Sequence, residues 1–133
     1  AATAEGTTRL RGAAELRVKE SDRLAVMGRG LQTLGVGLEE YADGMDVEGG
    51  PISGGAVDGA GDHRCAMSFC ILGQAAPDSV EVAGCEHIDT SYPGFVDDLV
   101  RVGGRVAVGG RFAADGPDRG HGPLPHGAPQ SGT

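Results

Sequence analysis

The sequence predicts an α/β protein in which helices and strands form packed layers. Segments with the pattern of strands alternate along the chain with segments whose apolar residues recur every three or four positions. The apolar 39% of the 133 residues is mainly Val, Leu, Ala and Met, with no Trp, three Phe and two Tyr. This composition favours small aliphatic side chains packed between helices and sheets over an aromatic core.

Three helices are expected. The first lies in "ESDRLAVMGRGLQTLG", with Ser21 or Asp22 as its cap, Gly35 as its stop, and one apolar face formed by Leu24, Met27, Leu31 and Leu34. The second starts after Asp62 and runs through "HRCAMSFCILGQAA"; apolar residues nearly surround it, so it should be buried. The third takes Pro93 as its first residue, before "GFVDDLVRVG", and turns one face inward through Phe95, Leu99 and Val102.

The strands fall between these helices. Thr7–Gly12 alternates and ends in glycine, and two further short strands flank a turn at Asp43–Gly44. A weak strand is expected in the Gly-rich segment 51–64, and clearer ones in "SVEVAG" (79–84) and "RVAVGG" (105–110). Residues 1–108 therefore form the folded portion. The Gly- and Pro-rich segment 109–133 should be a disordered tail, and its His121 and His126 are not expected to bind a metal.

Composition also limits the class of protein. The net charge of −8 argues against nucleic acid as a partner, and no run of about 18 apolar residues predicts a membrane span. The N-terminal residues lack the apolar core of a signal peptide. Three cysteines without a C-x-x-C spacing fit neither a disulfide framework nor a zinc site, so we expect Cys65 and Cys70 to fill the core and the protein to lie in the reducing cytoplasm.

Cations stand at the start of two predicted helices, where acids are usually preferred. Lys19 and Arg23 lie at the first start, and His63 and Arg64 at the second. A cation beside the positive end of a helix is unfavourable unless an anion lies nearby. Free backbone N–H groups and a guanidinium together suit a phosphate or a carboxylate, so the two helix ends could hold such a ligand.

A simpler interpretation competes with this one. Arg17, Lys19 and Arg23 could instead form solvent-exposed ion pairs with Glu15, Glu20 and Asp22. If an anion is bound, Glu20 would lie beside it and could exchange a proton with it, and His63 could be a second proton carrier or an orienting donor. The charge spacing alone does not decide between the two.

Three sequence blocks add a specific resemblance. "LRVKESDRL" (16–24), "GDHRCAMSF" (61–69) and "TSYPGF" (90–95) occur in order and resemble the C-terminal part of the 5-enolpyruvylshikimate-3-phosphate synthase family. The similarity extends from about residue 1 to residue 108. It implies an inside-out α/β (α+β) domain of the enolpyruvyl transferase type, built from βαβαββ units with helix N-termini at an interdomain cleft.

The resemblance also implies an activity. This family moves the enolpyruvyl (carboxyvinyl) group of phosphoenolpyruvate to the 5-hydroxyl of shikimate 3-phosphate and releases phosphate, in the shikimate pathway of aromatic amino-acid biosynthesis. It needs no metal or organic cofactor and is inhibited by glyphosate. By the same resemblance, Arg23 and Arg64 match arginines that hold phosphoenolpyruvate, and Glu20 matches the glutamate that donates a proton to its methylene carbon.

Three further positions carry over with less definite roles. Lys19 matches the lysine that contacts shikimate 3-phosphate near the reacting hydroxyl, and His63 matches a histidine of the site. Glu15 stands where some members place a polar residue that contacts substrate. Many members carry a phosphoenolpyruvate-binding lysine where this chain has Thr90, and the glyphosate-insensitive branch resembles this chain more closely at that block.

The chain is shorter than the family by more than a factor of three and resembles about the last half of one domain. We therefore expect the isolated chain to be inactive without the N-terminal portion, which would be its main partner. Two alternatives stay open: a non-catalytic piece that binds phosphate-type anions or complements a separate N-terminal piece, and the sister family that acts on UDP-N-acetylglucosamine. The "KESDR" and "DHR" motifs favour the shikimate enzyme over that sister family.

Overall fold

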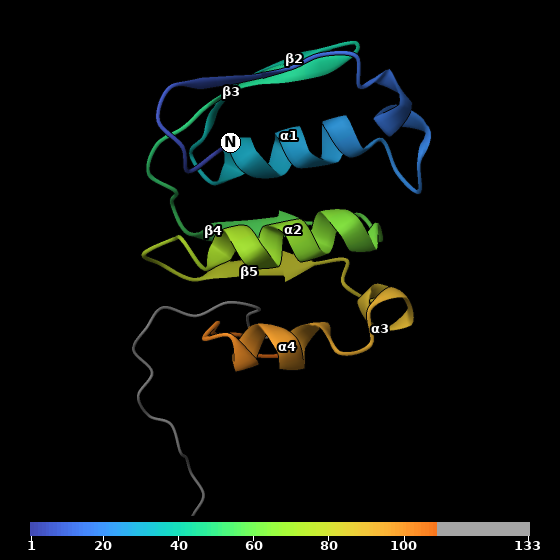
Figure 1. The fold of residues 1–133 in the computed structure, drawn as a ribbon, viewed down its shortest axis with the longest axis vertical. Helices are drawn as coiled ribbons and strands as arrows, with labels where there is room; N and C mark the ends of the chain where they lie inside the picture. Colours follow the sequence, from blue (N-terminus) through green and yellow to red (C-terminus); the bar gives the residue numbers. More distant parts are fainter. Residues whose placement is uncertain (109–133) are drawn as a thin grey trace, which may run out of the picture.

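The computed structural model describes residues 1–108, in which helices and strands form stacked layers (Figure 1). One three-stranded antiparallel sheet covers the first helix, and a two-stranded parallel sheet flanks the second. The elements in chain order are β1 (Thr7–Leu10), the 3-10 helix η1 (Ala14–Val18), α1 (Arg23–Thr33), β2 (Gly37–Tyr41), β3 (Gly44–Glu48), β4 (Gly55–Asp58), α2 (His63–Gly73), β5 (Val80–Ala83), α3 (Ile88–Ser91) and α4 (Phe95–Arg101).

Helix α1 begins and ends as its sequence predicts. The Asp22 carboxylate accepts a hydrogen bond from the backbone N–H of Ala25 at 3.0 Å, which identifies Asp22, and not Ser21, as the cap. The helix stops because Gly35 takes a left-handed conformation, with φ of +86°. Leu24, Leu31 and Leu34 are buried and Met27 is half-buried, so the predicted apolar face is confirmed.

The three-stranded sheet has the order β1-β3-β2, and both pairings are antiparallel. The β2–β3 hairpin pairs Tyr41 with Gly44, which confirms the predicted turn in this region. The second sheet pairs β4 with β5 in parallel, and α2 makes the connection between them. The weak strand expected in segment 51–64 is therefore present, and it lies beside the strand expected in 79–84.

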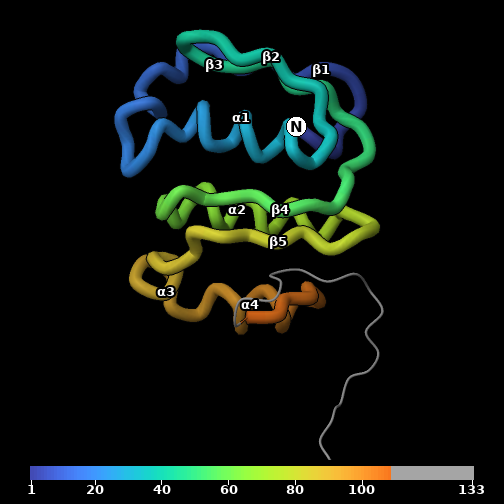
Figure 2. Tube along the Cα trace, turned by 180° about the vertical axis from the view of Figure 1, so that it is seen from behind, coloured from blue at the N-terminus to red at the C-terminus, as the bar shows by residue number. Residues whose placement is uncertain are grey.

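Two apolar clusters hold the layers together. The larger one fills the space between the three-stranded sheet, α1, α2 and β4, and contains Leu24, Leu34 and Phe69. The smaller one contains Ile88, Phe95 and Leu99 and packs α3 and α4 onto α2. Seen from behind, strands β4 and β5 lie in front of α2, with α1 above them and α4 below (Figure 2). As predicted, Cys65 and Cys70 are buried.

The order of elements agrees with the implied architecture. The succession β1, α1, β2, β3 corresponds to the last four elements of a βαβαββ unit, and β4, α2, β5, α4 corresponds to the first four of the next. Residues 1–108 thus span parts of two consecutive units. Each part places one long helix, α1 or α2, with its N-terminus after a capping aspartate.

Several details of the second half differ from the sequence-based expectations. Residues 105–108 of the expected strand 105–110 have no regular structure. The Gln74 side-chain amide accepts from the Arg105 N–H and donates to the Arg105 carbonyl, so it occupies the backbone groups that a partner strand would use. The rest of that segment, and the tail to residue 133, lie outside the described residues. Pro93 does not begin a helix: the turn from Tyr92 to Phe95 places it at the position that proline favours, and α4 starts at Phe95.

Three smaller corrections follow. Val102 caps the C-terminus of α4 and is exposed, unlike Phe95 and Leu99 on the buried face. Ile71 on α2 is also half exposed, so this helix is not buried all round. The short helices η1 and α3 were not expected from the apolar pattern. Within residues 1–108, no helix is both long and apolar enough to cross a membrane.

Candidate anion-binding site

The segment between η1 and α1 holds the first group of site residues. Lys19 caps the end of η1, and Lys19 and Glu20 are both exposed. Lys19 pairs with Glu15 at 3.0 Å, and the Arg23 guanidinium pairs with Glu20. These are two of the ion pairs of the simpler interpretation, so in this structure Lys19 and Glu20 are engaged with their sequence neighbours.

Arg17 provides the third such pair and has a structural task. Its guanidinium binds the Asp22 carboxylate and Glu40, each at 2.9 Å. Its Nε donates to the carbonyl of Ala42 at 2.9 Å and its Nη2 to that of Tyr41. Protein groups therefore use both sides of this guanidinium, which ties η1 and the cap of α1 to the β2–β3 hairpin.

Asp62 joins the starts of α1 and α2, and its side chain is fully buried. Its Oδ1 caps α2 by accepting from the backbone N–H groups of Arg64 and Cys65, at 3.0 and 3.4 Å. Its Oδ2 accepts from Arg23 Nε and from the Ser21 hydroxyl, both at 2.8 Å. Residues 39 and 41 positions away in the sequence thus meet on one carboxylate.

The electrostatics of Asp62 follow from these four donors. Burial alone would raise the pKa of its carboxyl group, but the hydrogen bonds from Arg23, Ser21 and the Arg64 N–H outweigh it and lower the pKa. Asp62 is therefore charged at neutral pH despite its burial. Its negative charge in turn raises the pKa of the Arg23 guanidinium, chiefly through their hydrogen bond.

The start of α2 provides the second group. His63 and Arg64 are the first two residues of this helix; His63 is half-buried and Arg64 is exposed. Among residues 1–108, neither side chain has an ion pair or a hydrogen-bond partner. The Arg64 guanidinium therefore remains available to a ligand, in contrast to that of Arg17.

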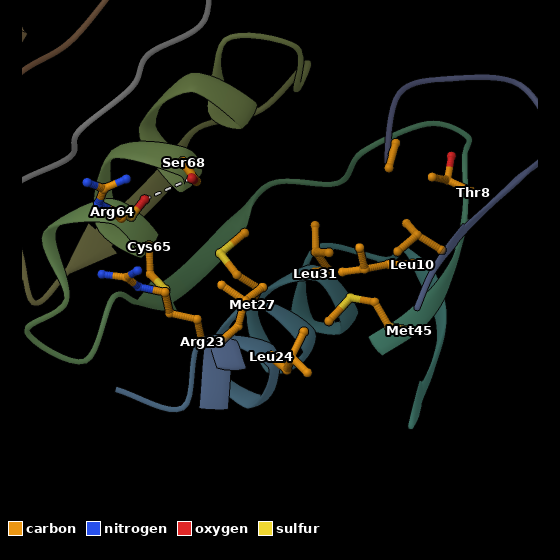
Figure 3. A pocket seen from close by; sticks show the side chains of 13 residues that line it. Thr8, Leu10, Arg23, Leu24, Met27, Leu31, Met45, Arg64, Cys65 and Ser68 are labelled. Atoms are coloured by element: carbon orange, nitrogen blue, oxygen red, sulfur yellow. Dashed lines mark hydrogen bonds between the residues drawn. The ribbon is translucent and has the colours of Figure 1, made fainter. Parts of the chain in front are cut away.

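A cavity of about 380 Å³ contains both Arg23 and Arg64 in its wall. Figure 3 shows their guanidinium groups near each other at one end, while Leu10, Leu31 and Met45 line the other part. The two helix-start arginines therefore line one cavity. A small anion would stay at the arginine end, because a charge in the apolar part would lose its hydration without new partners.

The remaining expected residues lie around this site to different degrees. Glu20 touches it through Arg23, and Glu15 only through Lys19. Thr90 lies on α3, which packs against α2 in the other apolar cluster, away from the cavity. Residues 1–108 contain no group of three or more His, Cys, Asp or Glu side chains placed to bind a metal ion.

The sequence did not indicate the link between Asp62 and Arg23. Asp62 was expected only as a helix cap, and Ser21 as an alternative cap for α1. The residues lie about 40 positions apart and share no local spacing pattern, so only the packing of α1 against α2 brings them together. A hint was present in each capping aspartate, since each precedes a cation by one or two residues.

Comparison with known proteins identifies the family. The family model described as EPSP synthase (3-phosphoshikimate 1-carboxyvinyltransferase) matches residues 1–99. The chain is 55% identical over 104 residues to the 3-phosphoshikimate 1-carboxyvinyltransferase of Halorhodospira halophila, covering 77% of this chain and 23% of that protein. It is 47% identical over 106 residues to the one from Coxiella burnetii, covering 80% and 24%.

A solved structure gives the same result. The EPSP synthase from Acinetobacter baumannii superposes with a TM-score of 0.73 at 42% identity, over 76% of this chain and 24% of that one. The chain therefore spans about a quarter of the length of the relatives it matches. Its layered α/β fold is that of part of an enolpyruvyl transferase. The match over residues 1–99 shows that the chain belongs to the EPSP synthase (3-phosphoshikimate 1-carboxyvinyltransferase) family.

Proposed function

We propose that this chain forms the C-terminal part of an enzyme that moves the enolpyruvyl group of phosphoenolpyruvate to the 5-hydroxyl of shikimate 3-phosphate, in the shikimate pathway. The observation that carries the proposal is the meeting of Arg23 and Arg64, from two helix starts, at one end of one cavity. Phosphoenolpyruvate carries a carboxylate and a phosphate, and a guanidinium group can donate hydrogen bonds to the oxygens of either one.

In the proposed chemistry, Glu20 is the proton donor. Glu20 gives a proton to the methylene carbon of phosphoenolpyruvate, which makes the adjacent carbon electrophilic. The 5-oxygen of shikimate 3-phosphate bonds to that carbon, its hydroxyl proton leaves to a base, and the bond to phosphate breaks. Loss of a methyl proton restores the double bond, so the substrates and products balance. The Glu20 carboxylate, already on Arg23, lies beside the anion that Arg23 would hold.

Lys19 and His63 would complete the site on this chain. Lys19 contacts shikimate 3-phosphate near the reacting hydroxyl and exchanges its present partner, Glu15, for the substrate. His63, at the first position of α2, orients the bound anion or carries a proton. Glu15 keeps Lys19 in place before substrate binds, which is the only role that its single contact supports.

The other three quarters of the enzyme would be the partner of this chain. Exposed apolar side chains such as Val18, Ile71 and Val100 are a surface that such a partner would cover. We infer that the isolated chain binds phosphate-type anions weakly and does not turn over. Glyphosate, itself an anion, would compete for the same arginines. Three free cysteines fit a reducing compartment, so we place the protein in the cytoplasm.

A chimera tests the proposal. The Halorhodospira halophila enzyme would receive this chain in place of its own corresponding 104-residue segment, and phosphate release from the two substrates would be measured. We expect activity in the chimera and none in the isolated chain. Turnover by the isolated chain would show that these residues form the whole active site and not only part of it.

Variants of the chimera test the role of Glu20. Glu20→Gln keeps the shape and removes the proton, so kcat should fall by about 100-fold or more. Glu81→Gln, the same change at an exposed position on β5, is the matched control and should leave kcat unchanged. Equal kcat values for the two variants would show that Glu20 is not the proton donor.

A further inference from the structure

We propose that Asp62 is a positioning residue: its buried carboxylate fixes the Arg23 guanidinium beside Arg64, so that both can bind one anion. The inference rests on the proposed function for the identity of that anion. Asp62 touches no ligand in this account and acts only through Arg23.

Asp62 does more than a helix cap requires. A cap needs one acceptor, and Oδ1 provides it to the N–H groups of Arg64 and Cys65. Oδ2 is committed to the Arg23 and Ser21 side chains, which come from the segment that begins the other helix. A serine or threonine at this position would cap α2 equally well but would not also accept from Arg23. The second oxygen therefore serves the arginine.

The contact leaves Arg23 oriented and still able to bind a ligand. Asp62 accepts a hydrogen bond from Arg23 Nε and Glu20 accepts one from Nη2, while Nη1 has no hydrogen-bond partner within residues 1–108. The side chain is 13% exposed, so its plane is held by packing as well as by these bonds. Without Asp62, the guanidinium could turn away from Arg64 toward the solvent-exposed Glu20.

The start of α1 supplies an internal comparison. Asp22 also caps a helix and also binds an arginine, Arg17, but protein carbonyls and Glu40 use the other donors of that guanidinium. The Asp22–Arg17 pair is therefore purely structural. Asp62 binds its arginine in a similar way, but that arginine, Arg23, lines the cavity and keeps one donor free. This difference makes Asp22→Asn the matched control for Asp62→Asn.

The first experiment uses the chimera. Asp62→Asn keeps the size and the capping oxygen but places an amide N–H₂ opposite Arg23 Nε, so the two donors repel. We expect the KM for phosphoenolpyruvate to rise at least tenfold while kcat at saturation falls less than threefold. Asp22→Asn, at a more exposed cap, should lower thermal stability less and leave that KM within twofold. An equal rise in KM for both variants would overturn the positioning role.

The second experiment uses the chain itself and does not require turnover. Inorganic phosphate would be titrated while the side-chain Nε–H signals of Arg23 and Arg64 are followed by NMR. We expect both signals to shift with one common dissociation constant, and the Asp62→Asn variant to bind phosphate at least fivefold more weakly than the Asp22→Asn variant. Equal phosphate affinities would reject the inference even if the chimera were inactive, whereas an inactive chimera with this difference retained would reject only the proposed reaction.

Discussion

Adding one methyl group at Gly30 should push α1 and α2 apart, and the structure allows the cost to be worked out. A Cβ at Gly30 would lie 2.2 Å from Cζ and 2.5 Å from Cε1 of Phe69, whereas ordinary contacts begin near 3.4 Å. Phe69 is fully buried on α2, so its ring cannot swing into solvent. Overpacking of this kind costs about 1–3 kcal/mol.

Gly28 on the same helix provides the control. Its added Cβ would lie 3.0 Å from Glu40 Oε1, the end of a flexible side chain. In both variants, alanine gains about 1 kcal/mol of helix propensity over glycine. Because this gain is common to the two, the difference in their free energies of unfolding isolates the overpacking cost. We expect Gly30→Ala to be less stable than Gly28→Ala by about 1–3 kcal/mol.

Urea unfolding, followed by circular dichroism, measures this difference. In a Phe69→Leu background the smaller side chain leaves room, so the penalty of Gly30→Ala should shrink. The chimera adds a functional readout, because a wider gap between α1 and α2 separates Arg23 from Arg64 and should weaken phosphoenolpyruvate binding. Equal stabilities of Gly28→Ala and Gly30→Ala would refute the close helix contact on which the shared site depends.

Two further predictions concern titrating groups. Burial alone would raise the pKa of Asp62, but its hydrogen bonds lower it, and the hydrogen bond from the Ala25 N–H lowers the pKa of Asp22. Both carboxylates therefore stabilise the fold above the unfolded value of about 3.9 and lose this contribution as the pH falls through their lower folded values. The free energy of unfolding should drop as the pH is lowered below about 5, less steeply in Asp62→Asn, and a pH-independent value there would contradict this. Iodoacetamide should modify Cys85 first, as followed by mass spectrometry, because Cys85 is half-buried and a hydrogen bond from Cys70 lowers its pKa. The same bond and burial raise the pKa of Cys70, and burial raises the pKa of Cys65. Earlier labelling of Cys65 would be inconsistent with this packing.

Local signals explain what could be predicted of the fold. The capping aspartates, the 3–4 spacing of apolar residues and the left-handed Gly35 act within one helix, and α1 and α2 appear where these signals place them. Residues 105–108 form no strand, because an apolar pattern cannot reveal whether a partner strand exists beside it. Pro93 was misplaced because proline suits both the first turn of a helix and the second position of a β-turn.

The site was predictable in its residue types but not in its connections. Arg23 and Arg64 stood out because each places a cation at a helix start. Their shared cavity depends on the contact of α1 with α2, and the Asp62–Arg23 pair depends on the same contact. The ion pairs of Lys19 and Glu20 with their neighbours are those of the simpler interpretation. In the proposed function, ligand binding would compete with this local pairing for the same side chains.

The most direct test of the central claim is the dissociation constant of phosphoenolpyruvate for the chimera, measured with shikimate 3-phosphate present. Arg64→Lys keeps the charge but loses the bidentate fork, and Arg23→Lys keeps the charge but loses the free Nη1 donor and the bond to Asp62. A hydrogen bond to a charged group contributes about 1.5–3 kcal/mol, so each change should weaken binding by roughly 10- to 150-fold. Arg29→Lys, the same change at an exposed position of α1, should have no effect. If either Arg23 or Arg64 can be replaced by lysine with no loss of affinity, the two helix starts do not bind one anion together.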